Sequence, residues 1–172
     1  MEYELLIREA EVEDAAALVS FLNRVSVETD FTSLDRDGIL MTDTEMELFL
    51  DKQAHSGNQI TLLALLNDEI AGLVNITADQ RKRVRHIGDL FIVIGKKYWN
   101  NGLGSFLLEE AIEWAQASGI LRRLQLTVQT RNQGAVHLYQ QHGFVIEGRQ
   151  ERGAYIEEGK FIDVYLMGRL ID

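Results

Sequence analysis

A strand, a glycine turn and a helix follow one another directly between residues 89 and 109, and this stretch constrains the fold more than any other. The apolar run from Leu90 to Ile94 predicts a buried strand, and an amphipathic pattern begins right after a Gly/Asn-rich turn. Backbone N–H groups at such a junction point into one concavity beside the positive end of the helix dipole. The stretch therefore predicts a phosphate or pyrophosphate site. Gly102 and Gly104 lack Cβ, which permits positive φ and close approach of an anion at both positions.

The bulk properties are those of a soluble globular protein. A length of 172 residues, 46% of them hydrophobic and 26% charged, predicts one domain over residues 1–172. No apolar run reaches the roughly 18–20 residues of a membrane span, and the first residues lack the basic and apolar parts of a signal peptide. Cysteine is absent, which excludes disulfides and leaves only His and carboxylates for any metal. We therefore expect a cytoplasmic protein with no metal and no membrane partner.

The net charge of −10 bears on the choice of partner. Nucleic-acid binding relies on a basic footprint, so no nucleic-acid partner is expected. The same charge would steer a cationic amine toward the protein, although net negative charge also serves solubility alone.

The remaining patterns predict the element order βααβββαβαββ. The expected strands are residues 3–8, 60–66, 70–77, 90–94, 124–128, 144–148 and 161–170, and the expected helices are residues 13–24, 42–53, 104–118 and 132–141. Thr42 and Glu45 have the spacing of a capping box. Residues 67–69 read as a hairpin turn, and residues 80–85 as a basic tip that is exposed or that reaches a phosphate of the ligand.

Two common phosphate loops do not fit the glycine turn. A Walker A loop ends in Gly-Lys-Ser/Thr, and Gly104-Ser105-Phe106 does not supply that ending. A dinucleotide fingerprint needs a third glycine near the first strand of the chain, whereas this turn carries Leu107 at that place and lies mid-chain. Neither kind of nucleotide site is expected.

The stretch resembles instead the acyl-CoA pyrophosphate loop of the GNAT (general-control-related N-acetyltransferase) superfamily, where Arg/Gln-x-x-Gly-x-Gly/Ala joins a strand to a helix. A second block, Asn132-Gln-Gly-Ala-Val-His-Leu-Tyr139-Gln-Gln-His-Gly-Phe144, is similar to the Asn-x-x-Ala-x-x-x-Tyr-x-x-x-Gly-Phe signature of the next helix in that superfamily. The two blocks stand in the family's order. The tail resembles the branch that contains ribosomal-protein N-terminal acetylases and spermidine acetylases.

This sequence departs from the family pattern at three positions near the loop. Trp99 stands where Arg or Gln is usual, Asn101 where a basic or small residue is frequent, and Lys96 where proline is common. These departures leave the effect on CoA affinity open. Because main-chain N–H groups would hold the phosphate, they weaken the resemblance without removing it.

The resemblance implies an α/β fold, with a mixed, mainly antiparallel and splayed central sheet flanked by helices. It implies an acyltransferase that uses acetyl-CoA as co-substrate and acetylates a primary amine directly, on a peptide N-terminus, a polyamine or another small amine. The residues implied to bind acetyl-CoA are Ile92, Val93, Ile94, Trp99, Asn100, Asn101, Gly102, Leu103, Gly104, Ser105, Asn132 and Tyr139. Main-chain groups of Ile92 and Ile94 would pair with the pantetheine arm, and a homodimer is a frequent state among relatives.

The resemblance also implies catalytic roles. Tyr139 matches the tyrosine that protonates the departing thiolate, although it also fits a core aromatic. The base position of many relatives falls on Gly88, which cannot act. Strand alternation points Asp89 to the opposite face, so His86 is the tentative base, with a water relay as the alternative. No cysteine and no evident Ser-His pair support a covalent intermediate.

The acceptor site is expected in the acidic connector of residues 26–41. Glu28, Asp30 and Phe31 are the tentative substrate-binding residues, and the alternative is a solvated loop. Because Gly88 leaves the base unassigned, a catalytically silent acyl-CoA-binding sensor or interaction module stays as the second hypothesis. Retention of Tyr139 argues against it, since binding alone does not need that hydroxyl.

Overall fold

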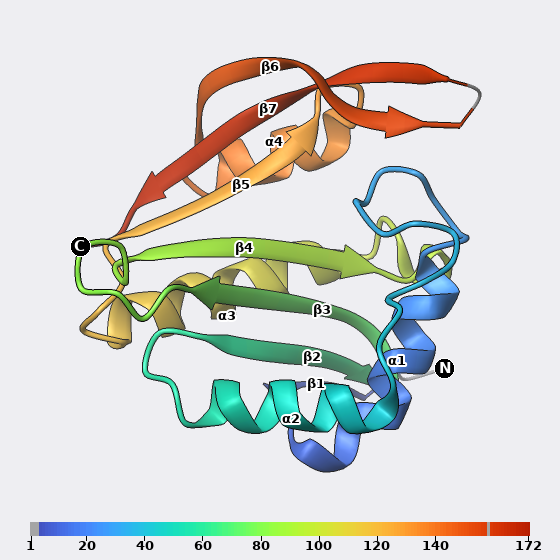
Figure 1. Ribbon diagram of the computed structural model, residues 1–172, viewed down its shortest axis with the longest axis vertical. Coiled ribbons are helices and arrows are strands. Elements are labelled where there is room, and N and C mark those ends of the chain that lie inside the picture. Colours follow the sequence, from blue (N-terminus) through green and yellow to red (C-terminus); the bar gives the residue numbers. More distant parts are fainter. Residues whose placement is uncertain (1–3, 158) are drawn as a thin grey trace.

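Seven strands form one sheet in the computed structural model, which describes residues 4–157 and 159–172 (Figure 1). The strands are β1 (Leu5–Glu9), β2 (Ile60–Leu66), β3 (Glu69–Ala78), β4 (Ile87–Ile94), β5 (Arg123–Gln129), β6 (Val145–Ile156) and β7 (Lys160–Leu170), and the helices are α1 (Ala15–Val25), α2 (Asp43–Ala54), α3 (Leu103–Ala117) and α4 (Gln133–Gln141). The predicted element order and the mixed, mainly antiparallel sheet are confirmed. Tyr3, the expected start of the first strand, and Glu158, in the last hairpin, lie outside the described residues.

The sheet splits at its centre. Its spatial order is β1-β2-β3-β4-β5-β7-β6, and β4–β5 is the one parallel pair among these neighbours. That ladder holds only from Ile87↔Arg123 to Asp89↔Gln125. Beyond it β4 and β5 diverge, so the second half of each strand has a free inner edge (Figure 1).

Two hydrophobic clusters cover opposite faces of the sheet. Neighbouring residues of β2 enter different clusters, because side chains alternate along a strand. Leu63 packs with residues of α1 and α2, whereas Leu62 packs with residues of α3. The α3 cluster continues to Tyr139 on α4 and Met167 on β7. This one cluster therefore spans the split and connects β4 to β5 through the side chains of α3 and α4 (Figure 1).

Local sequence signals set several element ends. Thr42 Oγ1 accepts the Glu45 N–H at 3.1 Å and Glu45 Oε1 accepts the Thr42 N–H at 3.3 Å, which confirms the capping box. Asn67 and Asp68 take positive φ, 50° and 67°, in the turn between β2 and β3. This is the conformation that two-residue hairpins favour.

The main difference from the expected elements is the length of β6. The sequence pattern predicts a strand to residue 148, but β6 continues to Ile156 because it pairs with β7 along its length, with irregular register at two places. Gly153 is required by this pairing, since a Cβ there would lie 2.4 Å from Val164 Cγ2. Among the described helices, none is long and apolar enough to cross a membrane.

Candidate active site

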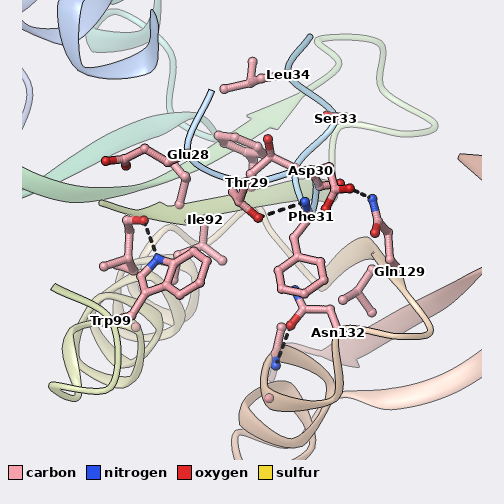
Figure 2. Close-up of a pocket in the computed structure, with 18 of the residues that line it drawn as sticks. Glu28, Thr29, Asp30, Phe31, Ser33, Leu34, Ile92, Trp99, Gln129 and Asn132 are labelled. Carbon is pink, nitrogen blue, oxygen red and sulfur yellow. Dashed lines mark hydrogen bonds between the residues drawn. The ribbon is translucent and has the colours of Figure 1, made fainter. Parts of the chain in front are cut away.

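A cavity of about 1210 Å³ opens where β4 and β5 diverge (Figure 2). Its walls come from residues 90–94 of β4, 127–129 of β5, the start of α3, one side of α4 and the β6–β7 hairpin. Residues 26–36, which we call the α1–α2 loop, complete the lining. The cavity thus joins segments that lie far apart in the sequence.

The main chain of β4 presents alternate residues to this cavity. The Gly95 N–H donates to the Ala71 carbonyl at 2.8 Å, so odd-numbered residues of β4 direct their main-chain groups toward β3. Ile92 and Ile94 consequently direct theirs into the cavity, while Val93 lines it only in part, with its peptide groups turned to β3. The Trp99 indole Nε1–H already donates to the Ile94 carbonyl at 2.8 Å (Figure 2).

The N-terminus of α3 faces the same cavity. Gly102 precedes the helix with φ 79°, and no side chain caps the helix within the described chain. The Phe106 N–H makes the bond to the Gly102 carbonyl, so the N–H groups of Leu103, Gly104 and Ser105 have no acceptor inside the helix. The helix dipole adds partial positive charge here, and an anion fits the position.

Two glycine-turn residues differ from the sequence expectation. Gly104 lies inside α3 and does not take positive φ. A Cβ at Gly104 would lie 3.1 Å from Leu138 Cδ2, so the position serves the close approach of α3 and α4. Asn100, not Gly104, joins Gly102 in positive φ, at 63°. Asn101 lies outside the residues that line the cavity.

Helix α4 brings Asn132 and Tyr139 to the opposite wall. Asn132 caps the helix, with its Oδ1 accepting the Ala135 N–H at 3.3 Å. Tyr139 lines the cavity with only 7% of its surface exposed, and its ring packs 5.8 Å from that of Phe144. Burial raises the pKa of Tyr139 well above its usual value, so the hydroxyl keeps its proton at any physiological pH.

The α1–α2 loop carries all three expected substrate-binding residues into the lining. Glu28 Oε1 accepts the Lys96 N–H at 3.1 Å, which ties the loop to the segment after β4. The Phe31 ring stacks on Trp99, with centroids 6.5 Å apart and an interplanar angle of 25° (Figure 2). Asp30 lies beside these residues, next to the end of β5 (Figure 2).

The other contacts of this loop reach the C-terminal half of the sheet. The Asp30 carbonyl accepts Gln129 Nε2–H at 2.7 Å, and its carboxylate accepts Arg131 Nη2–H at 2.6 Å. Farther along, Arg36 forms an ion pair with Glu157 in the β6–β7 hairpin. The loop therefore bridges both walls of the cavity, whereas the sequence left a solvated loop as the alternative.

His86, Gly88 and Asp89, the three residues considered for the base, all lie outside the lining of the main cavity. A Cβ at Gly88 would lie 2.8 Å from Ile76 Cγ2 and 2.9 Å from Leu124 Cδ2, so this face is packed core. His86 does not line the cavity, and its carbonyl accepts the N–H groups that lead into β5. Asp89 lies on the other face, where its Oδ1 accepts Gln125 Nε2–H at 2.8 Å.

Asp89 lines a second cavity of about 350 Å³, and both cavities include Leu90 and Thr127.

The expected basic tip is exposed at Arg81, which pairs with Asp79 at 2.8 Å. In the described part of the chain, no group of three His, Cys or carboxylate residues is arranged to hold a metal ion.

One pair of residues escapes sequence inspection altogether. Ser105 Oγ lies 3.1 Å from His142 Nε2, although 37 positions separate the two residues. No Ser-His pair is evident in the sequence, but the folded chain brings these two side chains together. The pair forms because α3 and α4 approach each other closely at Gly104.

Comparisons with known proteins agree on one family. The chain matches the acetyltransferase (GNAT) family over residues 26–144. It is 32% identical over 109 residues to the L-amino acid N-acetyltransferase AaaT of Escherichia coli K12, an alignment covering 63% of this chain and 67% of that protein.

Two solved structures extend the comparison. The acetyltransferase of the GNAT family from Streptococcus pneumoniae is 85% identical with a TM-score of 0.96, covering 98% of this chain and all of that one. The fold also matches YncA of Salmonella typhimurium with its cofactor acetyl-CoA, at a TM-score of 0.85 and 18% identity over 98% of this chain and 95% of that one.

Proposed function

The chain belongs to the acetyltransferase (GNAT) family, and from this premise we propose that it transfers the acetyl group of acetyl-CoA directly to a primary amine. The observation that carries the proposal is the composition of the larger cavity at the sheet split. It combines an uncapped helix N-terminus, a free main-chain edge of β4 and a buried, neutral tyrosine. Each of these groups suits one part of the transfer reaction.

The donor fits along β4. The free N–H groups at the start of α3 would hold the pyrophosphate, with Gly102 giving close access. The Ile92 N–H and carbonyl and the Ile94 N–H would pair with the pantetheine arm, since Trp99 already occupies the Ile94 carbonyl. The Ile92 N–H is also the group we expect to donate to the thioester oxygen as negative charge develops there.

Tyr139 is the proposed general acid. Its raised pKa keeps the hydroxyl protonated, as a proton donor to a leaving thiolate must be. The proton passes from the Tyr139 oxygen to the CoA sulfur as the carbon–sulfur bond breaks. The reacting amine releases one proton to solvent. The tyrosine takes one proton back from solvent, so the number of protons balances.

A water relay is the proposed route for the amine proton. Asp89 is an exposed carboxylate at the last paired position before β4 and β5 diverge, and its cavity adjoins the main one through Leu90 and Thr127. Gln125 holds one carboxylate oxygen of Asp89. Asp89→Asn is expected to lower kcat/KM for the amine most strongly at low pH, where the acceptor is almost fully protonated. An unchanged pH profile of kcat/KM would exclude the carboxylate.

The acceptor end of the cavity favours a cationic amine. Four carboxylate residues line this cavity, and Arg36 is the single lysine or arginine among the described lining residues. The carboxylates belong to Glu28, Asp30, Asp35 and Glu157. Ion pairs offset two of these charges, because Asp30 contacts Arg131 and Glu157 contacts Arg36. The carboxylates of Glu28 and Asp35 therefore carry the argument for a polyamine over an amino acid or a peptide N-terminus as the acceptor class.

Free-thiol release from acetyl-CoA across a panel of amines tests the function. A diamine, spermidine, L-amino acids and a short peptide with a free N-terminus represent the acceptor classes, and a reaction without amine measures hydrolysis. Transfer to any amine supports the enzyme, and the ranking by kcat/KM identifies the class. Tight CoA binding with no thiol release from any amine would favour the silent binding module instead.

Three expectations stay predictions: a single domain over residues 1–172, a cytoplasmic location and a homodimer.

A further inference from the structure

The Ser105–His142 pair lies where the donor pyrophosphate is expected. Ser105 is the third residue of α3 and lines the cavity. His142 follows the last residue of α4, and its side chain is only 14% exposed. Besides Ser105 Oγ at 3.1 Å from Nε2, the imidazole has the Leu138 carbonyl 3.0 Å from Nδ1.

These two contacts fix the tautomer of a neutral His142. A carbonyl oxygen only accepts, so Nδ1 must carry the hydrogen that points to Leu138. In a neutral imidazole the other nitrogen then has a lone pair. The Ser105 hydroxyl therefore donates to Nε2, and its single hydrogen is turned away from the cavity.

A phosphate at the α3 N-terminus would face the oxygen lone pairs of this hydroxyl and not its hydrogen. Phosphate oxygens accept hydrogen bonds, and the Ser105 oxygen would offer them a lone pair. If the hydroxyl turns to donate to phosphate, Nε2 loses its donor. Protonation of Nε2 restores every bond, because the imidazolium then donates to Ser105 Oγ while the hydroxyl donates to phosphate.

The charges around His142 permit this change. Glu109, one turn after Ser105 on α3, places Oε1 3.5 Å from Nε2 and would balance the imidazolium. Arg169 on β7 opposes it, since its Nε lies 3.2 Å from where a Cβ on the neighbouring Gly143 would be. The negative charge of the incoming phosphate, like that of Glu109, favours the protonated form of His142.

We propose that binding of the donor pyrophosphate is coupled to uptake of a proton by His142, transmitted through the Ser105 hydroxyl. The proposal rests on the proposed function, because it assumes that CoA occupies this cavity. The ring gains the proton on binding, so donor affinity rises as pH falls. One linked proton changes the dissociation constant by at most about tenfold per pH unit.

Calorimetric titration with dephospho-CoA tests the coupling. This probe keeps the pyrophosphate but lacks the 3′-phosphate, whose own titration near pH 6 would add protons to the count. Binding heats in two buffers of different ionisation enthalpy, at about pH 7, give the number of protons taken up. We expect a clear fraction of one proton per dephospho-CoA and none with pantetheine, which has no phosphate.

Two variants and two controls assign the proton. His142→Gln offers a permanent N–H to Ser105 and cannot titrate, so it should bind dephospho-CoA without proton uptake. Ser105→Ala removes the connection and should do the same, which keeps the test available if His142→Gln folds poorly. The exposed His55, which follows the last residue of α2, is the control: His55→Gln should leave the uptake unchanged. His137 lines the cavity, so His137→Gln separates it from His142 as the source.

Binding of dephospho-CoA by the wild type without proton uptake would overturn this inference and leave the proposed function standing. Uptake that persists in His142→Gln, or that disappears in His137→Gln, would also overturn it. Failure of acetyl-CoA and dephospho-CoA to bind at all would overturn the proposed function itself.

Discussion

Replacement of Tyr139 by phenylalanine removes one oxygen from the cavity wall and nothing else. The ring keeps its packing against Phe144, and helix α4 keeps its cap at Asn132. We therefore expect the free energy of unfolding in urea to change by less than about 1 kcal/mol. Binding of acetyl-CoA should also persist, because most of its expected contacts come from main-chain groups of β4 and α3.

The effect on turnover should be large by comparison. A positioned general acid contributes roughly 10²–10⁴-fold to rate, which corresponds to about 3–5 kcal/mol of barrier height. Tyr139→Phe should lower kcat by that factor with little change in KM. Thiol release at saturating acetyl-CoA and amine measures kcat directly, and calorimetry with CoA checks that the donor still binds.

The pH profile gives a second check with a definite sign. Burial raises the pKa of Tyr139, so the acid form persists above the ordinary titration range of tyrosine near pH 10. The wild-type kcat should show no loss from this group between neutral pH and about pH 10. Turnover within about threefold of wild type in Tyr139→Phe would refute the role, as would an alkaline loss near pH 8 that the variant abolishes.

Three further outcomes test the fold. Gly88→Ala should destabilise by about 1–3 kcal/mol, because its Cβ enters packed core; Gly134→Ala, with open space around it in α4, should be neutral or stabilising in the same urea titration. Thr42→Ala should cost about 1 kcal/mol through loss of the α2 cap, read from the urea midpoint. Arg8 holds the pKa of Asp14 below its usual value, so the pair stabilises at neutral pH and this contribution is lost as pH falls through and below the unfolded value near 4. Asp14→Asn should flatten that part of the stability–pH curve, and an unchanged curve would contradict the assignment.

Local sequence patterns predicted the parts of this protein that depend on nearby residues. The capping box at Thr42 and the hairpin turn at Asn67 need only a few neighbouring positions, and both have the expected geometry. The strand–turn–helix stretch was also predictable from local residues. Its positive φ at Gly102 and its uncapped helix start both follow from the residues of the stretch itself.

The sequence could not show which face of β4 is buried. Alternation separates Gly88 from Asp89, but only the placement of Ile76 and Leu124 makes the Gly88 face core. Whether His86, which alternation places on the same side as Gly88, acts as the base stays a prediction. A helix packed over that side is a tertiary fact, which no pattern within residues 86–94 contains.

Contacts across long sequence separations were equally out of reach. Asp30 and Arg131 lie 101 positions apart, and their ion pair helps to hold the α1–α2 loop over the cavity. Trp99 looked like a lost phosphate ligand, yet its indole satisfies the Ile94 carbonyl and its ring supports Phe31. Such roles depend on which surfaces meet after folding.

The position of β7 between β5 and β6 sets an order of assembly. β5 and β6 precede β7 in the chain, yet each pairs with β7 and neither pairs with the other. A nascent or truncated chain that stops before residue 160 could complete β1–β4 and α3, but its β5 would have no antiparallel partner. The donor-facing edge of β4 can thus form early, while the opposing wall waits for β7. Catalytic competence would then appear only after β7 (Lys160–Leu170) has been synthesised, later than the sequence motifs that identify the family.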